Sequence, residues 1–374
     1  MDETNHLPDV AVVGFEAAGC VPFHLKVLLS SRHPFAFFGS ASLYELATAG
    51  LNKPSIVPVR LVPQAIEGSE QEFRWLDQSL SDHSSIRTVF LMEVGRFRQE
   101  ILQAKLSNRF PQVKKRRLRG NFFPWNCFFH RPTLPDRLSF LKWQAWGALA
   151  RWCFEPQGLL VLGPIWEKLF PLLRILPGGR NLVRECPEPY DRSVITDTVD
   201  VKRDQHPPSV LFFGHHSARK GTCWALQQLA KYPGPIRAII AGKCDDEAYM
   251  RSLCESLPAH VTVEPLLHHV DDRTKETLFK RSSVIVMPYE IYLGSSGIIF
   301  ESLIYRRKVL ASSACTIDSA LVECGAVRIY ELKNPENFLL NLQRAMSEAP
   351  LWDRTEAFLR HHGAPQFVEA VLGS

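Results

Sequence analysis

The second half of the chain alternates short apolar runs with longer stretches in which apolar residues recur at a helical spacing. Polar loops separate the two kinds of segment, and the acidic pairs at 245–246 and 271–272 stand where the N-caps of two helices would be. Strands are expected at 209–214, 236–242, 260–264, 284–288 and 308–312, and helices at 222–232, 246–257, 272–280 and 298–305. This alternation predicts parallel βαβ units and a doubly wound α/β sheet.

The first half carries similar apolar runs at wider and less regular spacing. Strands are expected at 10–15, 36–40, 88–94 and 158–164, with Gly14 at the end of the first strand and Gly19 in the turn before the next helix. A second Rossmann-like unit with long insertions fits this pattern. A segment rich in proline and charge, 184–209, is expected to link the halves, so we expect one domain at 1–190 and another at 191–348.

Composition and charge exclude several classes of protein. The 44 basic and 39 acidic residues give a net charge of +5, an excess too mild to indicate nucleic acid, although it suits an anionic small molecule or an acidic membrane surface. The nine cysteines include no C-x-x-C pair, which argues against a zinc ribbon and favours reduced thiols in the cytoplasm. The polar N-terminus does not resemble a secretory signal, and no apolar run reaches the roughly 18 residues of a membrane span.

One candidate anion site lies at Arg219, Lys220 and Gly221, which follow a predicted strand and open a helix. Free N–H groups at a helix start, with a lysine beside them, suit a phosphate. Gly221 allows the backbone to turn tightly there. A charged loop at such a place is more often plain solvent-exposed surface.

A second candidate site lies in the loop from Glu290 to Gly297, which contains Gly294, Ser295 and Ser296. Small residues permit the close approach of a ligand, and Glu301, about one helical turn further on, could accept hydrogen bonds from two ribose hydroxyls. The alternative is a simple turn followed by a glutamate that favours the helix dipole. Both loops leave the carboxyl ends of strands in one parallel sheet, so together they could hold a diphosphate and a ribose.

Four segments resemble the nucleotide-binding domain of the retaining, family-4 group of GT-B-fold glycosyltransferases. In chain order they are FFGHHSARKG (212–221), IIAG (239–242), VIVMPYE (284–290) and GSSGIIFESLIYRRKVLAS (294–312). The resemblance implies two Rossmann-like domains that face each other across a cleft. It also implies that residues 349–374 form a C-terminal helical segment that packs back on the first domain.

The resemblance also implies site residues and an activity. It assigns Lys220 to the donor diphosphate, the amides of 295–297 to the phosphate and sugar, and Glu301 to the ribose. The implied donor site is completed by Gly214, His215, Arg219, Gly221, Glu290, Gly294, Ser295, Ser296 and Gly297. The implied reaction moves a hexose-like sugar from a nucleotide-diphosphate-sugar to an unknown acceptor with retention. It needs no metal and no cofactor beyond that substrate.

The sequence departs from the family pattern at two places. The family commonly has an arginine where this chain has His215, and its acidic pair has seven residues between the glutamates, which places Leu293 at the first acidic position. Glu290 and Glu301 are eleven positions apart instead. A catalytically inactive GT-B protein that binds sugar nucleotide or glycan therefore remains the alternative.

In the first domain, His130 within NFFPWNCFFHRP is the candidate for a residue facing the donor sugar, with His24 as a weaker one. A structural histidine beside aromatic core residues is the alternative for His130. Gly14 and Gly19 are expected in the acceptor-side loop. The acceptor is open, with polysaccharide or glycolipid assembly as an expectation from the family.

The basic run from Lys114 to Arg119 (KKRRLR) is followed by the aromatic residues Phe122, Phe123 and Trp125. Such a run could hold an acidic membrane surface or a phosphate-bearing acceptor, and it suits a cytoplasmic protein at the inner face of a membrane. One run is too little for a nucleic-acid interface. A solvated loop, or a module that binds membrane or nucleic acid without catalysis, are the other readings.

Overall fold

The computed structural model describes residues 8–17, 21–31, 33–49, 51, 57–64, 66, 68–121, 145–146, 148–150, 152–154, 156, 158–162, 181–190, 207–290 and 296–373. The chain forms two compact units, Met1–Pro189 with His362–Ser374, and Tyr190–His361. The segment 349–374 divides between them, because helix α14 (Trp352–Arg360) lies in the second unit and helix α15 (Ala364–Leu372) in the first.

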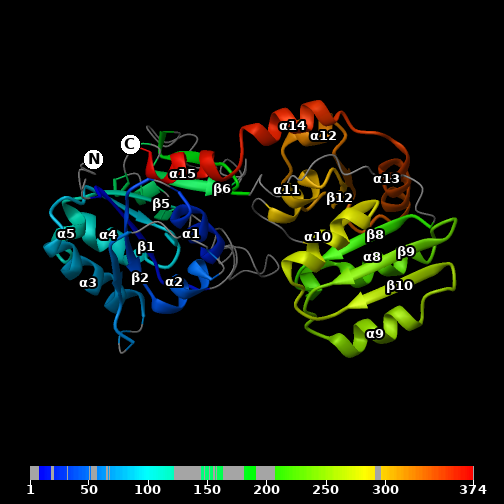
Figure 1. Cartoon of the computed structure of the whole chain (residues 1–374), viewed down its shortest axis with the longest axis horizontal. Helices are drawn as coiled ribbons and strands as arrows, with labels where there is room; N and C mark the ends of the chain where they lie inside the picture. Colours follow the sequence, from blue (N-terminus) through cyan, green and yellow to red (C-terminus); the bar gives the residue numbers. More distant parts are fainter. Residues whose placement is uncertain are drawn as a thin grey trace. The chain divides into compact units, whose positions relative to one another are not determined.

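The first unit is built on a seven-stranded parallel sheet with the strand order β3-β2-β1-β4-β5-β6-β7 (Figure 1). Its strands are β1 (Val10–Gly14), β2 (Ala36–Gly39), β3 (Val59–Leu61), β4 (Thr88–Leu91), β5 (Arg117–Asn121), β6 (Leu159–Leu162) and β7 (Val183–Cys186). Its helices are α1 (Val21–Leu29), α2 (Ala41–Thr48), α3 (Ser69–Ser79), η1 (Leu80–Asp82), α4 (Arg98–Leu106), α5 (Pro111–Lys114) and α15. Strands β3, β5 and β7 were not expected from the sequence, since each carries charged residues instead of an apolar run.

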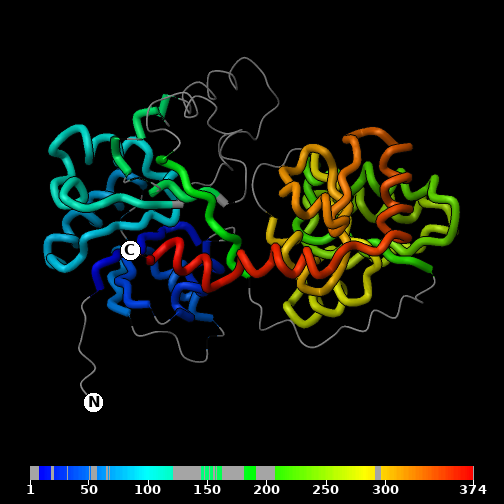
Figure 2. The backbone as a smooth tube through the Cα atoms, turned by 90° about the horizontal axis from the view of Figure 1, so that it is seen from above, coloured from blue at the N-terminus to red at the C-terminus, as the bar shows by residue number. Residues whose placement is uncertain are grey.

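Helices cover both faces of this sheet. The neighbouring residues Phe37 and Phe38 of β2 point to opposite faces, as alternate strand residues do. Phe37 stacks on Tyr44 of α2, whereas Phe38 meets the edge of Trp75 of α3. Helices α1, α2 and α15 share one hydrophobic core, and in Figure 2 the red α15 runs beside the blue N-terminal elements.

The second unit is built on a six-stranded parallel sheet with the order β10-β9-β8-β11-β12-β13. Its strands are β8 (Ser209–Phe213), β9 (Ile236–Ala241), β10 (Val261–Leu266), β11 (Val284–Met287), β12 (Lys308–Ser312) and β13 (Val327–Tyr330). Its helices are η6 (Ala218–Lys220), α8 (Thr222–Leu229), α9 (Glu247–Glu255), α10 (Asp272–Arg281), α11 (Gly297–Ile304), α12 (Ser319–Glu323), α13 (Pro335–Ser347) and α14. The predicted doubly wound sheet is confirmed, because Phe212 packs in the core under α8 while Phe213 contacts Phe279 of α10.

Each sheet reverses its strand order at one point. In the first unit the reversal lies between β1 and β4, and in the second unit between β8 and β11. The register of the second pair places Leu211 beside Ile285, so both strands end two residues further along, at Phe213 and Met287. Ligands of open α/β sheets bind beside the carboxyl ends of strands at such a switch point.

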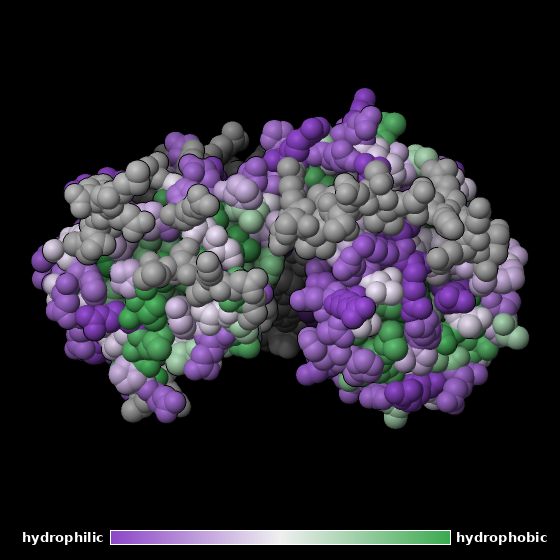
Figure 3. Space-filling view, in the orientation of Figure 1, coloured by the Kyte–Doolittle hydropathy of each residue, from purple (hydrophilic) through white to green (hydrophobic). Residues whose placement is uncertain are grey.

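Hydrophilic residues cover most of the described surface on the face drawn in Figure 3, with hydrophobic residues in smaller groups. Among the described residues, no helix combines the length and the apolar character that crossing a membrane requires.

The basic run 114–119 is only partly a surface feature. Lys114, Lys115 and Arg117 are exposed. The half-buried Arg116 donates to the carbonyl oxygens of Leu80 and His83, and the buried Arg119 donates to those of Ala370, Val371 and Gly373 at the end of α15. The expectation of one exposed basic run is therefore wrong for Arg119, which caps the C-terminus of a helix.

Candidate functional site

The loop from β8 to α8 begins where backbone segments press together. Gly214 has φ of +104°. Gly242 packs so closely against it that a Cβ on Gly242 would lie only 2.1 Å from the Gly214 carbonyl oxygen. The Gly214 N–H donates to the carbonyl oxygen of Ala241 at 2.9 Å. A Cβ built on Gly214 would lie 3.7 Å from Ile298, so this loop also reaches the first turn of α11.

His216 anchors the same loop in the interior. Its backbone N–H donates to the carbonyl oxygen of Lys243 at 2.7 Å, and its ring lies 3.3 Å from the Ala241 carbonyl oxygen through Nε2 and 3.1 Å from Thr222 Oγ1 through Nδ1. Burial lowers the pKa of His216 to about 4, so the ring is neutral at pH 7. Nε2 therefore carries the proton, and Nδ1 accepts from the threonine at the start of α8.

The loops that follow β8 and β11 are held against each other at Gly221. This residue has φ of +64°, and a Cβ on it would lie 2.1 Å from the carbonyl oxygen of Pro288. The Glu290 N–H donates to the carbonyl oxygen of Arg219 at 2.8 Å. Only glycine combines this backbone conformation with such a close approach.

Lys220 and Tyr289 connect the starts of α8 and α11. The Lys220 ammonium lies 3.6 Å from the centroid of the Tyr289 ring, within the range of a cation–π interaction. Burial raises the pKa of Tyr289, and a hydrogen bond with Ser296 acts in the opposite direction. Ser296 directly precedes α11, so the lysine, the tyrosine and the helix start form one continuous group.

The electrostatic state of Lys220 suits an anion. Desolvation, and secondly the charge of Arg219, lower the pKa of this lysine to about 7, from 10.5 in water. Burial and the neighbouring guanidinium group thus both disfavour the protonated form of Lys220. A bound diphosphate would supply negative charge and favour the protonated lysine.

The two helices that begin at the switch point differ from the others that follow a strand in this sheet. Helices α9, α10, α12 and α13 have N-cap side chains that accept a backbone N–H, from Asp246, Asp271, Asp318 and Asn334. Helices α8 and α11 follow Gly221 and Ser296, and neither has a side-chain cap within the described part of the chain. An anion could accept their first N–H groups without displacing a carboxylate.

Glu301 lies on α11, one turn beyond its start, and Lys275 of α10 orients its carboxylate. Lys275 Nζ lies 2.8 Å from Glu301 Oε1 and 3.1 Å from Asp272 Oδ1. Burial alone would lower the pKa of Lys275, but the two carboxylates outweigh it and raise the pKa. The ion pair fixes Oε1, so the partly exposed carboxylate is held in one orientation in which Oε2 can accept from a hydroxyl group.

Two further expected donor-site residues have partners of their own. Glu290 Oε2 lies 3.5 Å from Lys333 Nζ, in the turn between β13 and α13. His215 is exposed, and its Nε2 lies 2.5 Å from Asp245 Oδ1. A donor-binding role for either residue stays a prediction.

Other expected residues lie elsewhere. His130, Gly19, Leu293, Gly294 and Ser295 are outside the described residues. Gly14 ends β1, where a Cβ would lie 2.8 Å from a methyl group of Leu43. His24 is fully buried against Phe367, with ring centroids 5.0 Å apart, and burial lowers its pKa to about 3. His24 is therefore a core residue of the first unit, which argues against contact with a sugar.

Sequence reasoning missed three residues of this site: His216, Lys275 and Tyr289. The one available signal for His216 and Tyr289 was that they lie inside the segments 212–221 and 284–290, which resemble the glycosyltransferase family. Lys275 carried no signal, because its contact with Glu301 joins two different helices. Among the described residues, no group of three or more histidine, cysteine, aspartate or glutamate side chains could hold a metal ion.

Two doubly wound parallel sheets with these strand orders define the fold of the GT-B glycosyltransferases, and structural comparison supports that assignment. The Anabaena protein Alr3699/HepE, solved in complex with UDP and glucose, has a TM-score of 0.66 at 13% identity, over 97% of this chain and 98% of its own. The lipopolysaccharide outer core galactosyltransferase WaaB has a TM-score of 0.65 at 11% identity, over 96% and 97%. Sucrose-phosphate synthase from Thermosynechococcus elongatus has 0.60 at 14% identity, over 98% and 95%.

Identities this low show the fold that the chains share. No family model and no curated protein sequence matches this chain. The expected GT-B fold is thus confirmed by structure, although the sequences have diverged widely.

Proposed function

We propose that this protein is a glycosyltransferase that moves a sugar from a uridine-diphosphate sugar to an acceptor, with retention of anomeric configuration. The observation that carries the proposal is the meeting of two uncapped helix starts with Lys220 at the switch point of the second sheet. Glu301 lies one turn along the second of these helices, where a ribose attached to the diphosphate could reach it.

The chemistry follows from the charge that develops as the glycosidic bond breaks. The leaving diphosphate gains negative charge, which Lys220 and the first N–H groups of α8 and α11 would stabilise without rearrangement. Glu301 would accept hydrogen bonds from the ribose hydroxyls and fix the nucleotide. The donor phosphate itself would take the proton of the acceptor hydroxyl, so the reaction needs no carboxylate nucleophile and no metal ion.

The structural neighbours support the choice of substrate. HepE was solved with UDP-glucose, and another neighbour, trehalose-6-phosphate synthase, was studied for glycosyl transfer with retention. WaaB acts in the lipopolysaccharide outer core. We extend the proposal to a cytoplasmic enzyme of polysaccharide or glycolipid assembly, whose exposed Lys114, Lys115 and Arg117 suit an acidic membrane surface.

The proposal is tested by the affinity of the nucleotide for Glu301 variants. Calorimetric titration of the wild-type protein with UDP, GDP and ADP should show binding of UDP, and Glu301→Ala should weaken it about 10- to 100-fold, because hydrogen bonds to a charged group are lost. Lys275→Met should weaken binding less, since the carboxylate remains but loses its fixed orientation.

Glu323→Ala is the matched control, because Glu323 is an exposed glutamate on α12 of the same unit. Its UDP affinity should equal that of the wild type. Absence of UDP binding to the wild-type protein would refute the proposal. Binding without any turnover of UDP-glucose would leave a sugar-nucleotide-binding protein in place of an enzyme.

The affinity for UDP-glucose should also depend on pH. The pKa of Lys220 is about 7 in the free protein and the bound diphosphate favours the charged form, so binding takes up a proton above pH 7. Over a measured range of about pH 6 to 8.5, the affinity should be nearly constant below pH 7 and should fall by up to tenfold per pH unit above it. Lys220→Arg should abolish this fall, because an arginine stays protonated throughout. An equally steep fall in the arginine variant would contradict the assignment.

A further inference from the structure

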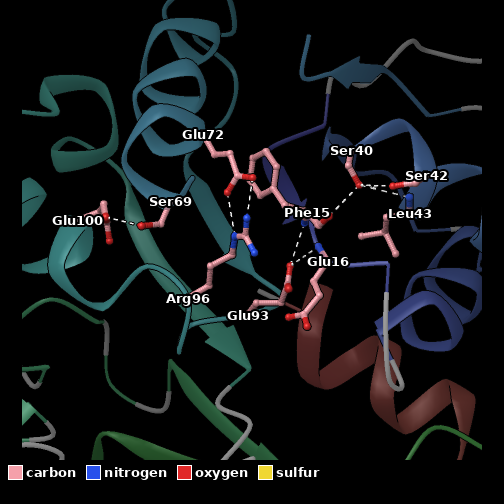
Figure 4. Close-up of polar contacts among 10 residues, drawn as sticks. All are labelled: Phe15, Glu16, Ser40, Ser42, Leu43, Ser69, Glu72, Glu93, Arg96 and Glu100. Atoms are coloured by element: carbon pink, nitrogen blue, oxygen red, sulfur yellow. Dashed lines mark hydrogen bonds and ion pairs between the residues drawn. The ribbon is translucent and has the colours of Figure 1, made fainter. Parts of the chain in front are cut away.

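The switch point of the first unit carries a pair of carboxyl groups that the donor site does not use. Strands β1 and β4 end next to each other, at Gly14 and Leu91. Glu16 follows the first of them and Glu93 the second. Figure 4 shows the two side chains next to each other, with their carboxyl groups side by side.

The backbone that bears Glu16 is fixed from two sides. The N–H groups of Phe15 and Glu16 donate to Glu93 Oε2 at 2.8 and 3.1 Å. On the other side, Ser40 at the end of β2 donates from its hydroxyl group to the Phe15 carbonyl oxygen at 2.8 Å. These bonds hold Glu16 at the carboxyl edge of the sheet, where its side chain is exposed to a ligand.

The second oxygen of Glu93 has an unusual environment. Glu93 is 5% exposed, and its Oε1 is buried without a hydrogen-bond donor among the described residues. The group beside it is another carboxyl, that of Glu16. Two neighbouring carboxyl groups, one of them buried, favour sharing one proton, because two negative charges so close together would repel each other strongly. Burial, and secondly the hydrogen bond with Glu16, raise the pKa of Glu93 to about 7.

The charges of the described residues around the pair disfavour an anionic ligand. Arg96 is the nearby cation among the described residues, and Glu72 of α3 binds it through two bonds, from Nε at 2.8 Å and from Nη2 at 2.7 Å. Three carboxyl groups, those of Glu16, Glu93 and Glu72, thus surround a single guanidinium group, that of Arg96. A phosphate or a carboxylate at this edge would meet negative charge, whereas a hydroxyl group would find an acceptor in the exposed carboxylate of Glu16.

We propose that Glu16 and Glu93 form an acid–carboxylate pair that binds the acceptor through uncharged sugar hydroxyl groups and excludes an acceptor that presents a phosphate there. Glu16 accepts from the sugar hydroxyl groups, and the proton that Glu93 donates to Glu16 holds this carboxylate in place. This inference rests on the proposed function, because it names the acceptor class of the same enzyme.

The test compares two sets of probes by saturation-transfer NMR, with UDP added to fill the donor site. One set contains methyl glucoside, methyl galactoside and methyl mannoside, and the other contains the 6-phosphates of the same sugars. The wild-type protein should bind at least one glycoside and bind its phosphate at least tenfold more weakly. Glu16→Gln should abolish binding of the glycoside, and the exposed Glu45→Gln of α2 should leave it unchanged.

A second variant tests the shared proton. Glu93→Gln mimics the protonated acid, because the amide can donate to Glu16 while its oxygen accepts from Phe15 and Glu16. Above pH 7 the pair loses its proton, the two charged carboxylates repel each other, and Glu16 is no longer held in place, so glycoside binding by the wild type should fall. Glu93→Gln should bind equally at all pH values from about 6 to 8.5. The charged groups that face the pair are Arg96 and Glu72, which bind each other.

Several results would overturn the inference. The wild-type protein could bind the sugar 6-phosphates as well as the glycosides, or it could bind no glycoside at all. Glu16→Gln could also bind a glycoside with the affinity of the wild type. None of these outcomes depends on the donor site, because UDP affinity is measured in the same samples. Loss of UDP binding would refute the proposed function, whereas intact UDP binding with any of these results would refute only the acceptor assignment.

Discussion

Replacing Lys220 with alanine should lower the rate of sugar transfer from UDP-glucose about 100- to 1,000-fold. In the proposed mechanism the ammonium of Lys220 stabilises the leaving diphosphate, and it lies in a partly desolvated place where its charge is worth more than in water. The measurement is kcat with a saturating donor, or donor hydrolysis if the acceptor is still unidentified.

The matched control is Lys231→Ala, which removes an exposed lysine from the turn after α8. Both variants should keep the wild-type circular dichroism spectrum, so that a loss of rate cannot be attributed to unfolding. A kcat for Lys220→Ala within threefold of the control would show that another group carries the diphosphate charge.

Replacing Gly221 with alanine should separate the two loops of the site. The left-handed conformation costs a residue with a Cβ about 1–2 kcal/mol, and crowding of the Pro288 carbonyl oxygen adds about 1–3 kcal/mol. We expect the free energy of unfolding of the second unit to fall by about 2–5 kcal/mol. UDP affinity should fall more than tenfold, because the hydrogen bond from Glu290 to Arg219 cannot persist when the loops part.

Gly234 provides the control for this change. It lies in the same unit, a Cβ on it would meet no atom within 4 Å, and its φ is not positive. Gly234→Ala should therefore change the free energy of unfolding by less than about 1 kcal/mol. Chemical denaturation of both variants with and without UDP is the measurement. Equal stability and equal UDP affinity in the two variants would show that the loop contact at Gly221 is unimportant.

The sequence predicted much of the second unit because its signals are local. Apolar runs mark the strands from β8 to β12 and acidic caps mark α9 and α10 within a few residues, and parallel strands place their carboxyl ends at one edge. The first unit was harder to predict. Strand β5 has the sequence RLRGN and β7 has VREC, so charged residues hid both strands from a search for apolar runs.

Side-chain partners were not available from the sequence. Lys275 and Glu301 are 26 positions apart on different helices, and Glu93 reaches Phe15 across 78 positions. Arg119 looked like part of a surface run until the end of α15 was found to surround it. Such contacts depend on how the elements pack, and no spacing rule encodes them.

The sequence by itself determined the alternation of strands and helices in the second unit and the location of two glycine-containing loops at strand ends. Tertiary structure decided that these loops meet at Gly221 and that Lys220 lies over Tyr289. It also decided that no described side chain caps the start of α8 or α11. The physical reason is that periodicity and capping act within one turn or one strand. Burial, and with it the charge state of Lys220 and Glu93, arises only when distant segments exclude water together.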